Sequence, residues 1–515
     1  MPNRDDRDAV RAPSATAGDT DFARALALQR SGRAAEAEAL CRRILADDPG
    51  NVGAAVLAAQ VTAQRGDVDG GLALLEDVLR RHPNAAAALN GVAALSLRLG
   101  RLPAAEAACR RLLATDPDNA AAHFNLGQVA DAAGRPAEAA DCYRRALQIH
   151  PDLAAARLPL AVALHRLGRV EEAMAAYRRV AAGGPGQAVA LFNLGTLLEA
   201  RGELAEAAEA YAAAIDIAPG EAAAQLQHAN VLYKLERFDA AVEAYRRLLQ
   251  RRPDIGEAHG NLAKSLWALG DLSGALAACE AGLRERPGDT AILAFKAVML
   301  RESGDAAGGA ALVDYDRFLK SARIAVPAGF ADLAAFNAAI AQFVLTHPTL
   351  AHEAQYHATK DGKHTGDLLL GPRGPIAALE RAVDDAVSRY VAALADDATH
   401  PFAANRPRRW KLSMWAVVME GQGYQIPHIH PYAWLSGVYY ARAPACIAAA
   451  ADHAGWIEFG EPLPEFRCKT PPERRLVRPE EGLMLLFPAY FHHRTVPFRS
   501  TETRVSLAFD VMTQP

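Results

Sequence analysis

Apolar positions repeat every 34 residues along residues 18–312. One position of the period holds a small residue: Ala25, Ala59, Ala93, Gly127, Ala161, Gly195, Ala229, Ala263 and Ala297. Another position holds a larger one: Cys41, Leu75, Cys109, Tyr143, Tyr177, Tyr211, Tyr245 and Cys279. A small residue lets two helices approach closely and a larger one fills the gap between them, so the pattern predicts stacked helix pairs.

Glycine and proline follow the same period. Prolines stand 34 residues apart at Pro49, Pro83, Pro117, Pro151, Pro185, Pro219, Pro253 and Pro287. Glycines mark the turn between the two helices of each unit, with Glu236 in the place of one glycine. Glycine relaxes such a turn and proline ends the second helix, so both agree with a helix pair in each period.

The rest of the chain has a different pattern. We expect residues 1–17 to be a disordered lead, residues 313–330 to be a linker, and helices over 331–348 and 375–397. From Trp410 onward the pattern predicts short strands separated by Gly, Pro and charged loops: WKLSMWAVVME, WLSGVYYAR, GWIEFG, GLMLLFP and TRVSLAFDV. Such a series of strands is typical of a sandwich or jelly-roll barrel, here over residues 331–515.

The composition mainly excludes some classes of protein and partner. The formal net charge is −4 and charged residues make up 23%, so no overall electrostatic attraction to nucleic acid is expected. We find neither a signal peptide nor an apolar run long enough for a membrane helix. The six cysteines show no ligand or disulfide spacing, which fits a reducing compartment, and we expect a cytoplasmic protein.

Histidines in the predicted strands are the candidate chemistry. His428 and His430 lie two residues apart, so on an extended segment their side chains point the same way. The adjacent His492 and His493 point to opposite faces, so at most one of them reaches a common metal. Arg504 and Ser506 again share one face. In a closed barrel these segments can meet and form a metal site, whereas we interpret His352, His357 and His364 as ordinary polar residues.

The 34-residue period closely resembles the tetratricopeptide repeat, over about residues 18–312. The resemblance implies a solenoid whose concave groove binds a protein or peptide. Two positions before the small residue stand Asn125, Asn193, Gln227 and Asn261. In some peptide-binding members amides at this position hold the partner's backbone; alternatively, these four simply tolerate a half-exposed helix face.

The blocks HIHPYAWLSGVYY and FPAYFHHRTVPFRSTETRVSLAFD resemble a bacterial subgroup of the iron(II)- and 2-oxoglutarate-dependent oxygenases. The resemblance implies a double-stranded β-helix, with Fe(2+) held by His428, His430 and His493. It also implies that 2-oxoglutarate is bound by Arg504 and Ser506, with Tyr439 in the same pocket, and that no catalytic residue is needed beyond the metal ligands. Together, the two resemblances imply a hydroxylase acting on a partner that the repeats hold.

One position departs from that family. Related enzymes commonly carry a carboxylate ligand where this chain has His430, so the metal lacks one negative charge, which Glu420 or Glu458 could supply. Three alternatives stay open: a cupin-type metal enzyme that does not use 2-oxoglutarate, a three-histidine zinc hydrolase, and a non-catalytic scaffold. The cupin lacks its usual glutamate after the histidine pair, and the hydrolase lacks an evident general base.

Overall fold

The computed structural model describes residues 17–352, 358–394, 397, 399–463, 466 and 468–514. Apart from Ala17, the expected disordered lead lies outside these residues, as does His357. The chain forms two compact units, Met1–Ala224 and Gln225–Pro515. Helical repeats fill the first unit and begin the second.

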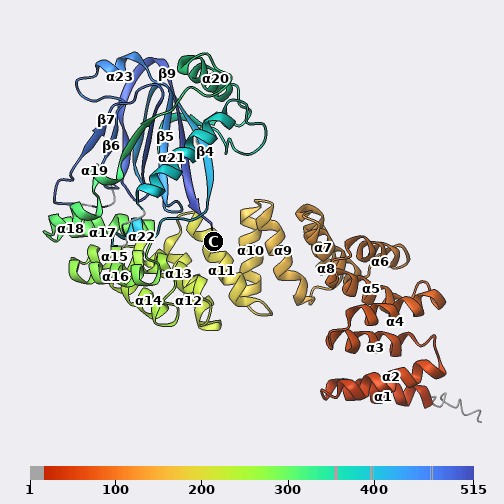
Figure 1. Ribbon diagram of the computed structural model, residues 1–515. Coiled ribbons are helices and arrows are strands. Elements are labelled where there is room, and N and C mark those ends of the chain that lie inside the picture. Colours follow the sequence, from red (N-terminus) through yellow and green to blue (C-terminus); the bar gives the residue numbers. More distant parts are fainter. Residues whose placement is uncertain are drawn as a thin grey trace, which may run out of the picture. The chain divides into compact units, whose positions relative to one another are not determined.

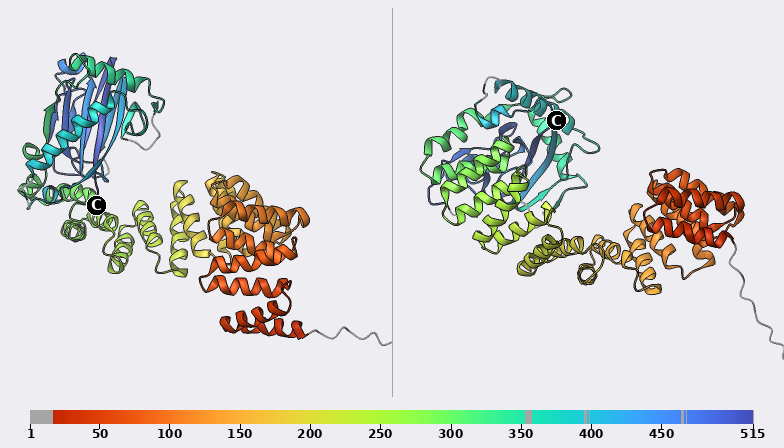
Figure 2. Two further views of the ribbon diagram at one scale, coloured as in Figure 1. Left: turned by 45° about the vertical axis from the view of Figure 1, so that its right-hand side comes forward. Right: turned by 90° about the horizontal axis from the view of Figure 1, so that it is seen from below.

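Each 34-residue repeat is a pair of antiparallel helices (Figures 1 and 2). In the described part of the first unit the helices are α1 (Ala17–Arg30), α2 (Ala34–Asp47), α3 (Val52–Gln64), α4 (Val68–Arg81), α5 (Ala86–Arg98), α6 (Leu102–Thr115), α7 (Ala120–Ala132), α8 (Pro136–Ile149), the short 3-10 helix η1 (Ala154–Ala156), α9 (Arg157–Arg166), α10 (Val170–Ala181), α11 (Gln187–Ala200) and α12 (Leu204–Ile217). The second unit continues with α13 (Ala222–Lys234), α14 (Phe238–Arg251), α15 (Gly256–Ala268), α16 (Leu272–Glu285), α17 (Thr290–Glu302) and α18 (Ala306–Leu312).

The predicted contact between small and larger residues is confirmed. A Cβ atom added to Gly127 would lie 2.6 Å from Cε1 of Tyr143, and one added to Gly195 would lie 2.8 Å from Cε1 of Tyr211. Both tyrosines are fully buried. The missing side chain at these two glycines therefore makes the space that the tyrosine ring occupies.

Glu236 shows why glycine recurs at the turns. The turn glycines take a left-handed backbone, for example at φ 82° in Gly270, and Glu236 adopts the same conformation at φ 57°. A non-glycine residue pays a steric cost there, because its Cβ crowds the following carbonyl. The repeat geometry therefore imposes the turn even where its preferred residue is absent.

The segment 313–330 is more structured than the expected linker. It contains α19 (Tyr315–Phe318) and β1 (Lys320–Arg323), and β1 pairs with a strand of the following domain. Tyr315 and Phe318 are buried in the core of that domain. Their apolar side chains fix the segment to the sheet.

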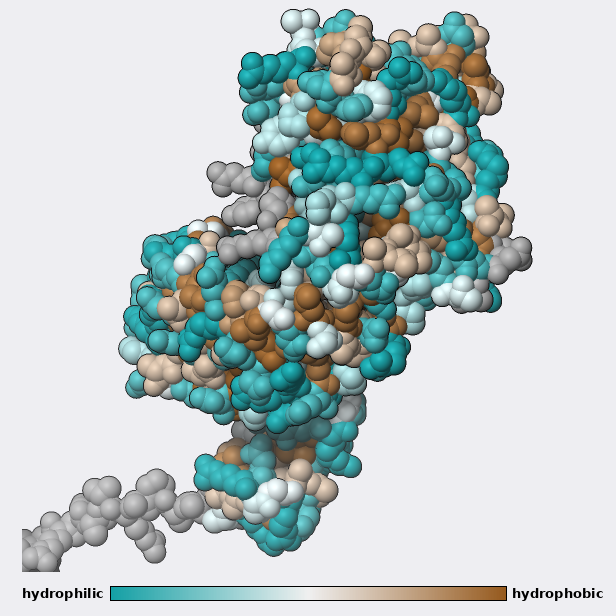
Figure 3. Space-filling view, turned by 90° about the vertical axis from the view of Figure 1, so that its left-hand side faces the viewer, coloured by the Kyte–Doolittle hydropathy of each residue, from teal (hydrophilic) through white to brown (hydrophobic). Residues whose placement is uncertain are grey.

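The remaining helices include the two that the apolar spacing predicted, α20 (Leu333–Leu345) and α21 (Ile376–Ala393). Two short ones are α22 (Pro401–Ala404) and α23 (Ala445–Ala449). No helix among the described residues is long and apolar enough to cross a membrane. On the face of the molecule shown in Figure 3, hydrophilic side chains predominate and apolar ones form separate patches.

The C-terminal domain is an antiparallel sheet in the order β1-β8-β5-β9-β4-β3-β2, with β6 paired to both β7 and β9. Its further strands are β2 (Ala351–His352), β3 (Thr359–His364), β4 (Trp410–His428), β5 (Leu435–Arg442), β6 (Ile457–Phe459), β7 (Arg475–Val477), β8 (Leu483–Pro488) and β9 (His493–Thr513). The predicted fold class, a helical solenoid followed by a jelly-roll domain, is confirmed.

Strand β9 lies at the centre of this sheet and has two different faces. Val505, Leu507 and Phe509 point into the hydrophobic core, which also contains buried residues of α20 and α21. Arg504 and Ser506 alternate with them and point to the opposite face. That opposite face forms the floor of a cavity.

Candidate functional site

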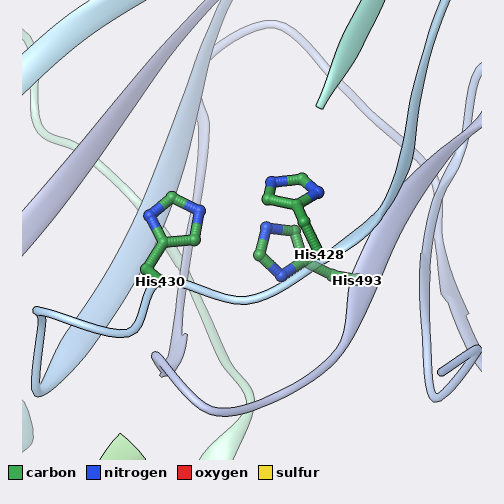
Figure 4. A group of neighbouring side chains, drawn as sticks. All are labelled: His428, His430 and His493. Atoms are coloured by element: carbon green, nitrogen blue, oxygen red, sulfur yellow. The ribbon is translucent and has the colours of Figure 1, made fainter. Parts of the chain in front are cut away.

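Three histidines meet in this cavity. His428 ends β4, His493 begins β9, and the pairing of the two strands places these residues directly opposite each other. His430 follows two residues after His428. One nitrogen of each imidazole lies within 4.8 Å of those of the other two, and Figure 4 shows the three rings gathered together.

Hydrogen bonds define which nitrogen each histidine offers. Nδ1 of His428 lies 2.8 Å from the Ile426 carbonyl oxygen, and Nδ1 of His493 lies 3.0 Å from that of Phe491. Each Nδ1 must donate to its carbonyl, which leaves a lone pair on Nε2. The backbone thereby leaves two Nε2 lone pairs available to a metal ion.

His430 is held by a carboxylate instead. Its Nδ1 lies 2.8 Å from Oδ1 and 3.0 Å from Oδ2 of Asp510, and Ser436 donates its hydroxyl proton to Oδ1 at 2.6 Å. The sequence analysis suggested Glu420 or Glu458 as the source of negative charge. These two pair with Lys363 and with Arg494, each at 2.9 Å, so Asp510 is the carboxylate that contacts the cluster.

The protonation of the cluster favours metal binding. Burial, followed by the charge of the neighbouring His430, lowers the pKa of His428 to about 3. Burial, followed by the charges of His428 and His430, also holds the pKa of His493 well below its usual value. Both rings are therefore neutral at physiological pH, as imidazole must be to bind a metal.

An arginine lies in the same cavity, which has a volume of about 640 Å³. Arg504 is only 2% exposed, and its Nη1 donates to the Gly455 carbonyl oxygen at 2.7 Å. Its guanidinium lies against the rings of Tyr440 and Phe498, at 5.3 and 5.7 Å from their centroids. Its Nε has no hydrogen-bond partner among the residues that the structure describes. A buried cation with a free donor in a cavity is suited to an anionic ligand.

Comparison with known families agrees with both parts of this structure. Residues 413–510 match a family model described as "Putative 2OG-Fe(II) oxygenase". Tetratricopeptide-repeat models match residues 22–76, 56–120, 97–154, 124–188, 188–221 and 226–290. The chain belongs to the tetratricopeptide-repeat proteins, and its C-terminal domain matches the 2OG-Fe(II) oxygenase model.

Similar solved structures cover the repeats. One, titled as a functional characterization of Pseudomonas aeruginosa pilF, is 20% identical over 40% of this chain and 95% of that chain, with a TM-score of 0.38. A second is YrrB, described as a TPR protein with an unusual peptide-binding site, at 21% identity over 36% and 95%, with a TM-score of 0.32. Similarities at these TM-scores do not bear on function. The comparison with curated proteins gives no match.

Tyr440, rather than the expected Tyr439, faces the cavity of the oxygenase domain. The Tyr439 hydroxyl donates to Oδ1 of Asn337 in α20 at 2.5 Å, on the core side of the sheet. Tyr440 lines the cavity, and its fully buried hydroxyl has no hydrogen-bond partner within the described part of the chain. Burial raises the pKa of Tyr440, which the Arg504 cation partly offsets. The alternation of side chains along β5 separates the two tyrosines, but the aromatic pair itself gave no sign of which one faces inward.

Other residues of this domain agree with the sequence prediction in some cases and differ from it in others. Ser506 lines the cavity as expected, and Trp434, from the predicted strand WLSGVYYAR, stacks on Phe402 in the core. His364, which we interpreted as an ordinary polar residue, also lines the cavity, with its Nε2 2.7 Å from Oγ1 of Thr359. His492 points away from the metal ligands, as its position next to His493 required.

The four amide residues of the repeats are all half-buried. In the first unit the Asn125 amide donates to Oδ1 of Asn90 at 3.4 Å, one repeat earlier. In the second unit Asn230 links two of the predicted residues, donating to Gln227 at 3.4 Å and accepting from Asn261 at 3.0 Å. Asn193 lies half-buried on α11. Asn90 and Asn230 stand outside the position that the sequence analysis selected and were missed for that reason.

Proposed function

We propose that this protein is an iron(II)- and 2-oxoglutarate-dependent oxygenase that acts on a protein or peptide held by its repeats. The observation that carries the proposal is the pairing of two features in one cavity. Three histidines offer Nε2 lone pairs in this cavity, and the buried Arg504, which also lines it, offers a free donor. A metal together with a dicarboxylate would satisfy both.

The donor set fits iron(II). His428, His430 and His493 would hold the ion from one side and leave the other side open for small ligands. Asp510 would supply, through His430, negative charge that a direct carboxylate ligand gives in related enzymes. Iron(II) with 2-oxoglutarate and dioxygen supplies the oxidising chemistry, in which 2-oxoglutarate is converted to succinate and carbon dioxide.

The chain's own residues bind and orient 2-oxoglutarate. Arg504 binds its distal carboxylate, since a guanidinium is permanently charged and presents donors in a plane that matches a carboxylate. Tyr440 donates a hydrogen bond beside it, because its hydroxyl is buried, protonated and unpaired. The apolar walls of Val438, Ile457 and Phe487 exclude water from this end of the cavity.

The alternative functions give no role to Arg504. A cupin-type enzyme or a zinc hydrolase needs the three histidines alone, and a buried free arginine would then carry a desolvation cost with no compensating ligand. A non-catalytic scaffold needs neither group.

Succinate release on addition of iron(II) and 2-oxoglutarate tests the activity. Arg504→Met should raise the 2-oxoglutarate concentration for half-maximal rate about tenfold or more, since a hydrogen bond to a charged group contributes about 1.5–3 kcal/mol. Tyr440→Phe should raise it several-fold. Tyr439→Phe is the matched control on the opposite face and should leave this concentration unchanged. Equal requirements in the Arg504 and Tyr439 variants would exclude Arg504 as the 2-oxoglutarate clamp.

The amide residues are proposed to hold the backbone of the partner. Combined replacement of Asn125, Asn193 and Asn261 by alanine should weaken capture of substrate proteins and leave partner-independent succinate release unchanged. Mass spectrometry of captured proteins, searched for added oxygen, would identify the substrate. If the variant captures substrate proteins as well as the wild type does, these residues are ordinary half-exposed amides without a role in partner binding.

A further inference from the structure

His492 faces a second cavity, separate from the one that contains its neighbour His493. This cavity has a volume of about 380 Å³. Its walls come from the last repeat, helices α17 and α18, and from the oxygenase domain, residues 470–473 and 490–492. All of them belong to the second compact unit. A volume of this size is typical of sites for small molecules.

Two polar side chains that line this cavity have buried nitrogens without a hydrogen-bond partner among the described residues. His492 is 7% exposed, and its Nε2 accepts or donates no hydrogen bond to any described residue. Nε and Nη2 of Arg301, on α17, are likewise buried and unpaired within the described ranges. Buried donors of this kind are rare in folded proteins, because each loses its bonds to water.

Within the described ranges, the nearby carboxylates have other partners or lie exposed, and none forms an ion pair with Arg301. Glu302 accepts hydrogen bonds from the backbone amides of Lys469 and Thr470, at 3.0 and 2.8 Å. Glu461 pairs with Arg474 at 2.7 Å, and Glu473, which also lines the cavity, is exposed to solvent. The cavity therefore presents a cation and an imidazole to whatever occupies it.

Apart from Thr470 and Glu473, the other walls are mainly apolar or aromatic. Those from the repeat are lined by Ala297, Val298, Ala306, Gly309, Ala310 and Val313. A purely inorganic anion would leave this surface uncovered, whereas an organic anion would cover it and gain the free energy of burying apolar area.

We propose that this cavity binds a small organic carboxylate. Arg301 and His492 hold the carboxylate group, and a short aliphatic chain packs against α17 and α18. The proposal does not depend on the oxygenase activity, since it uses none of the residues of the metal cavity. It gives a role to the second histidine of the His492–His493 pair.

Calorimetry of the full-length protein with acetate, butyrate, hexanoate and inorganic phosphate tests this. We expect one carboxylate bound per chain, with butyrate or hexanoate tighter than acetate, and phosphate not bound. Arg301→Met and Arg301→Gln should weaken binding at least tenfold. Arg284→Met, an exposed arginine on the preceding helix, should bind as the wild type does.

Arg504→Met separates this cavity from the metal cavity, where a carboxylate could also bind. Binding that survives Arg504→Met but not Arg301→Met supports the proposal. Binding lost only with Arg504→Met overturns it, as does phosphate binding with the same dependence on Arg301, or no binding of any probe.

Thermal unfolding adds a readout that a purely structural arginine would not give. The buried nitrogens of Arg301 lack hydrogen-bond partners among the described residues, which destabilises the protein without a ligand. The Arg301→Met variant should therefore unfold at a higher temperature than the wild type. Hexanoate should raise the unfolding temperature of the wild type and not that of the variant. If Arg301→Met instead lowers the unfolding temperature and keeps the response to hexanoate, Arg301 is structural and the proposal fails.

Discussion

Replacement of Asp510 by asparagine tests how the metal centre gains its negative charge. Asp510 contacts Nδ1 of His430 with both oxygens, at 2.8 and 3.0 Å, and both side chains are mostly shielded from solvent, at 19% and 13% exposed. Asparagine keeps a similar shape and can still accept the bond through its one carbonyl oxygen, so the change removes the charge and replaces the second acceptor by an NH2 group. A bond to a charged group is worth about 1.5–3 kcal/mol and a neutral one about 0.5–1.5 kcal/mol. The loss of about 1–2 kcal/mol corresponds to metal affinity about 5- to 30-fold weaker.

The assay is anaerobic titration of iron(II) against a competing chelator, repeated with cobalt(II) and its absorption spectrum. Asp367→Asn is the matched control, because Asp367 is a second carboxylate of the same cavity whose Oδ2 accepts from the Ser413 hydroxyl at 3.0 Å. It should leave metal affinity within twofold of the wild type. Equal affinity in the Asp510 variant, or an equal loss in the Asp367 variant, would refute a specific role of Asp510.

Further predictions concern the stability of the second unit, which contains all five tryptophans and is therefore followed by their fluorescence. Glu236→Gly should raise the free energy of unfolding by about 0.5–1 kcal/mol, because glycine avoids the steric cost of the left-handed turn, although it also gains freedom in the unfolded chain. A lower free energy of unfolding, measured by urea denaturation, would contradict this prediction. Burial lowers the pKa of His492 to about 3, so below pH 6.5 only the unfolded state takes up its proton. This histidine should cost about 1.4 kcal/mol of stability at pH 5.5 relative to pH 7.5 or above, a difference that His492→Gln should remove. Metal at about 100 times its Kd should raise the free energy of unfolding by about 2.7 kcal/mol, and His428→Ala should abolish the increase.

The repeats could be predicted from the sequence because their period is local. Each small residue meets a larger one only 16 positions later, as Gly127 meets Tyr143, so one unit contains most of the information about its own packing. Glu236 shows the strength of this information, since the turn forms there without glycine. The segment 313–330 escaped prediction because its strand pairs with Leu483–Leu486, more than 150 residues away, and no local signal marks such a partner.

For the site, the sequence predicted which residues face the cavity only where side chains alternate regularly along a strand. His428, Arg504 and Ser506 were found in this way, and all three face the cavity. Tyr440 was missed because the choice between two adjacent aromatics depends on which face of β5 meets the helices. The role of Asp510 was missed because it depends on the contact with His430, 80 positions earlier in the chain.

The order of the strands has a consequence for the synthesis of the protein. β9 carries His493, Arg504 and Asp510, and it follows every other strand of the sheet in sequence while pairing at the sheet's centre. During translation the earlier strands leave the ribosome with a gap between β5 and β4 where β9 will pair. His428 and His430 are then present without a third imidazole or a carboxylate partner. A nascent chain therefore lacks part of the proposed metal and 2-oxoglutarate site, which becomes complete in a single step, when β9 inserts.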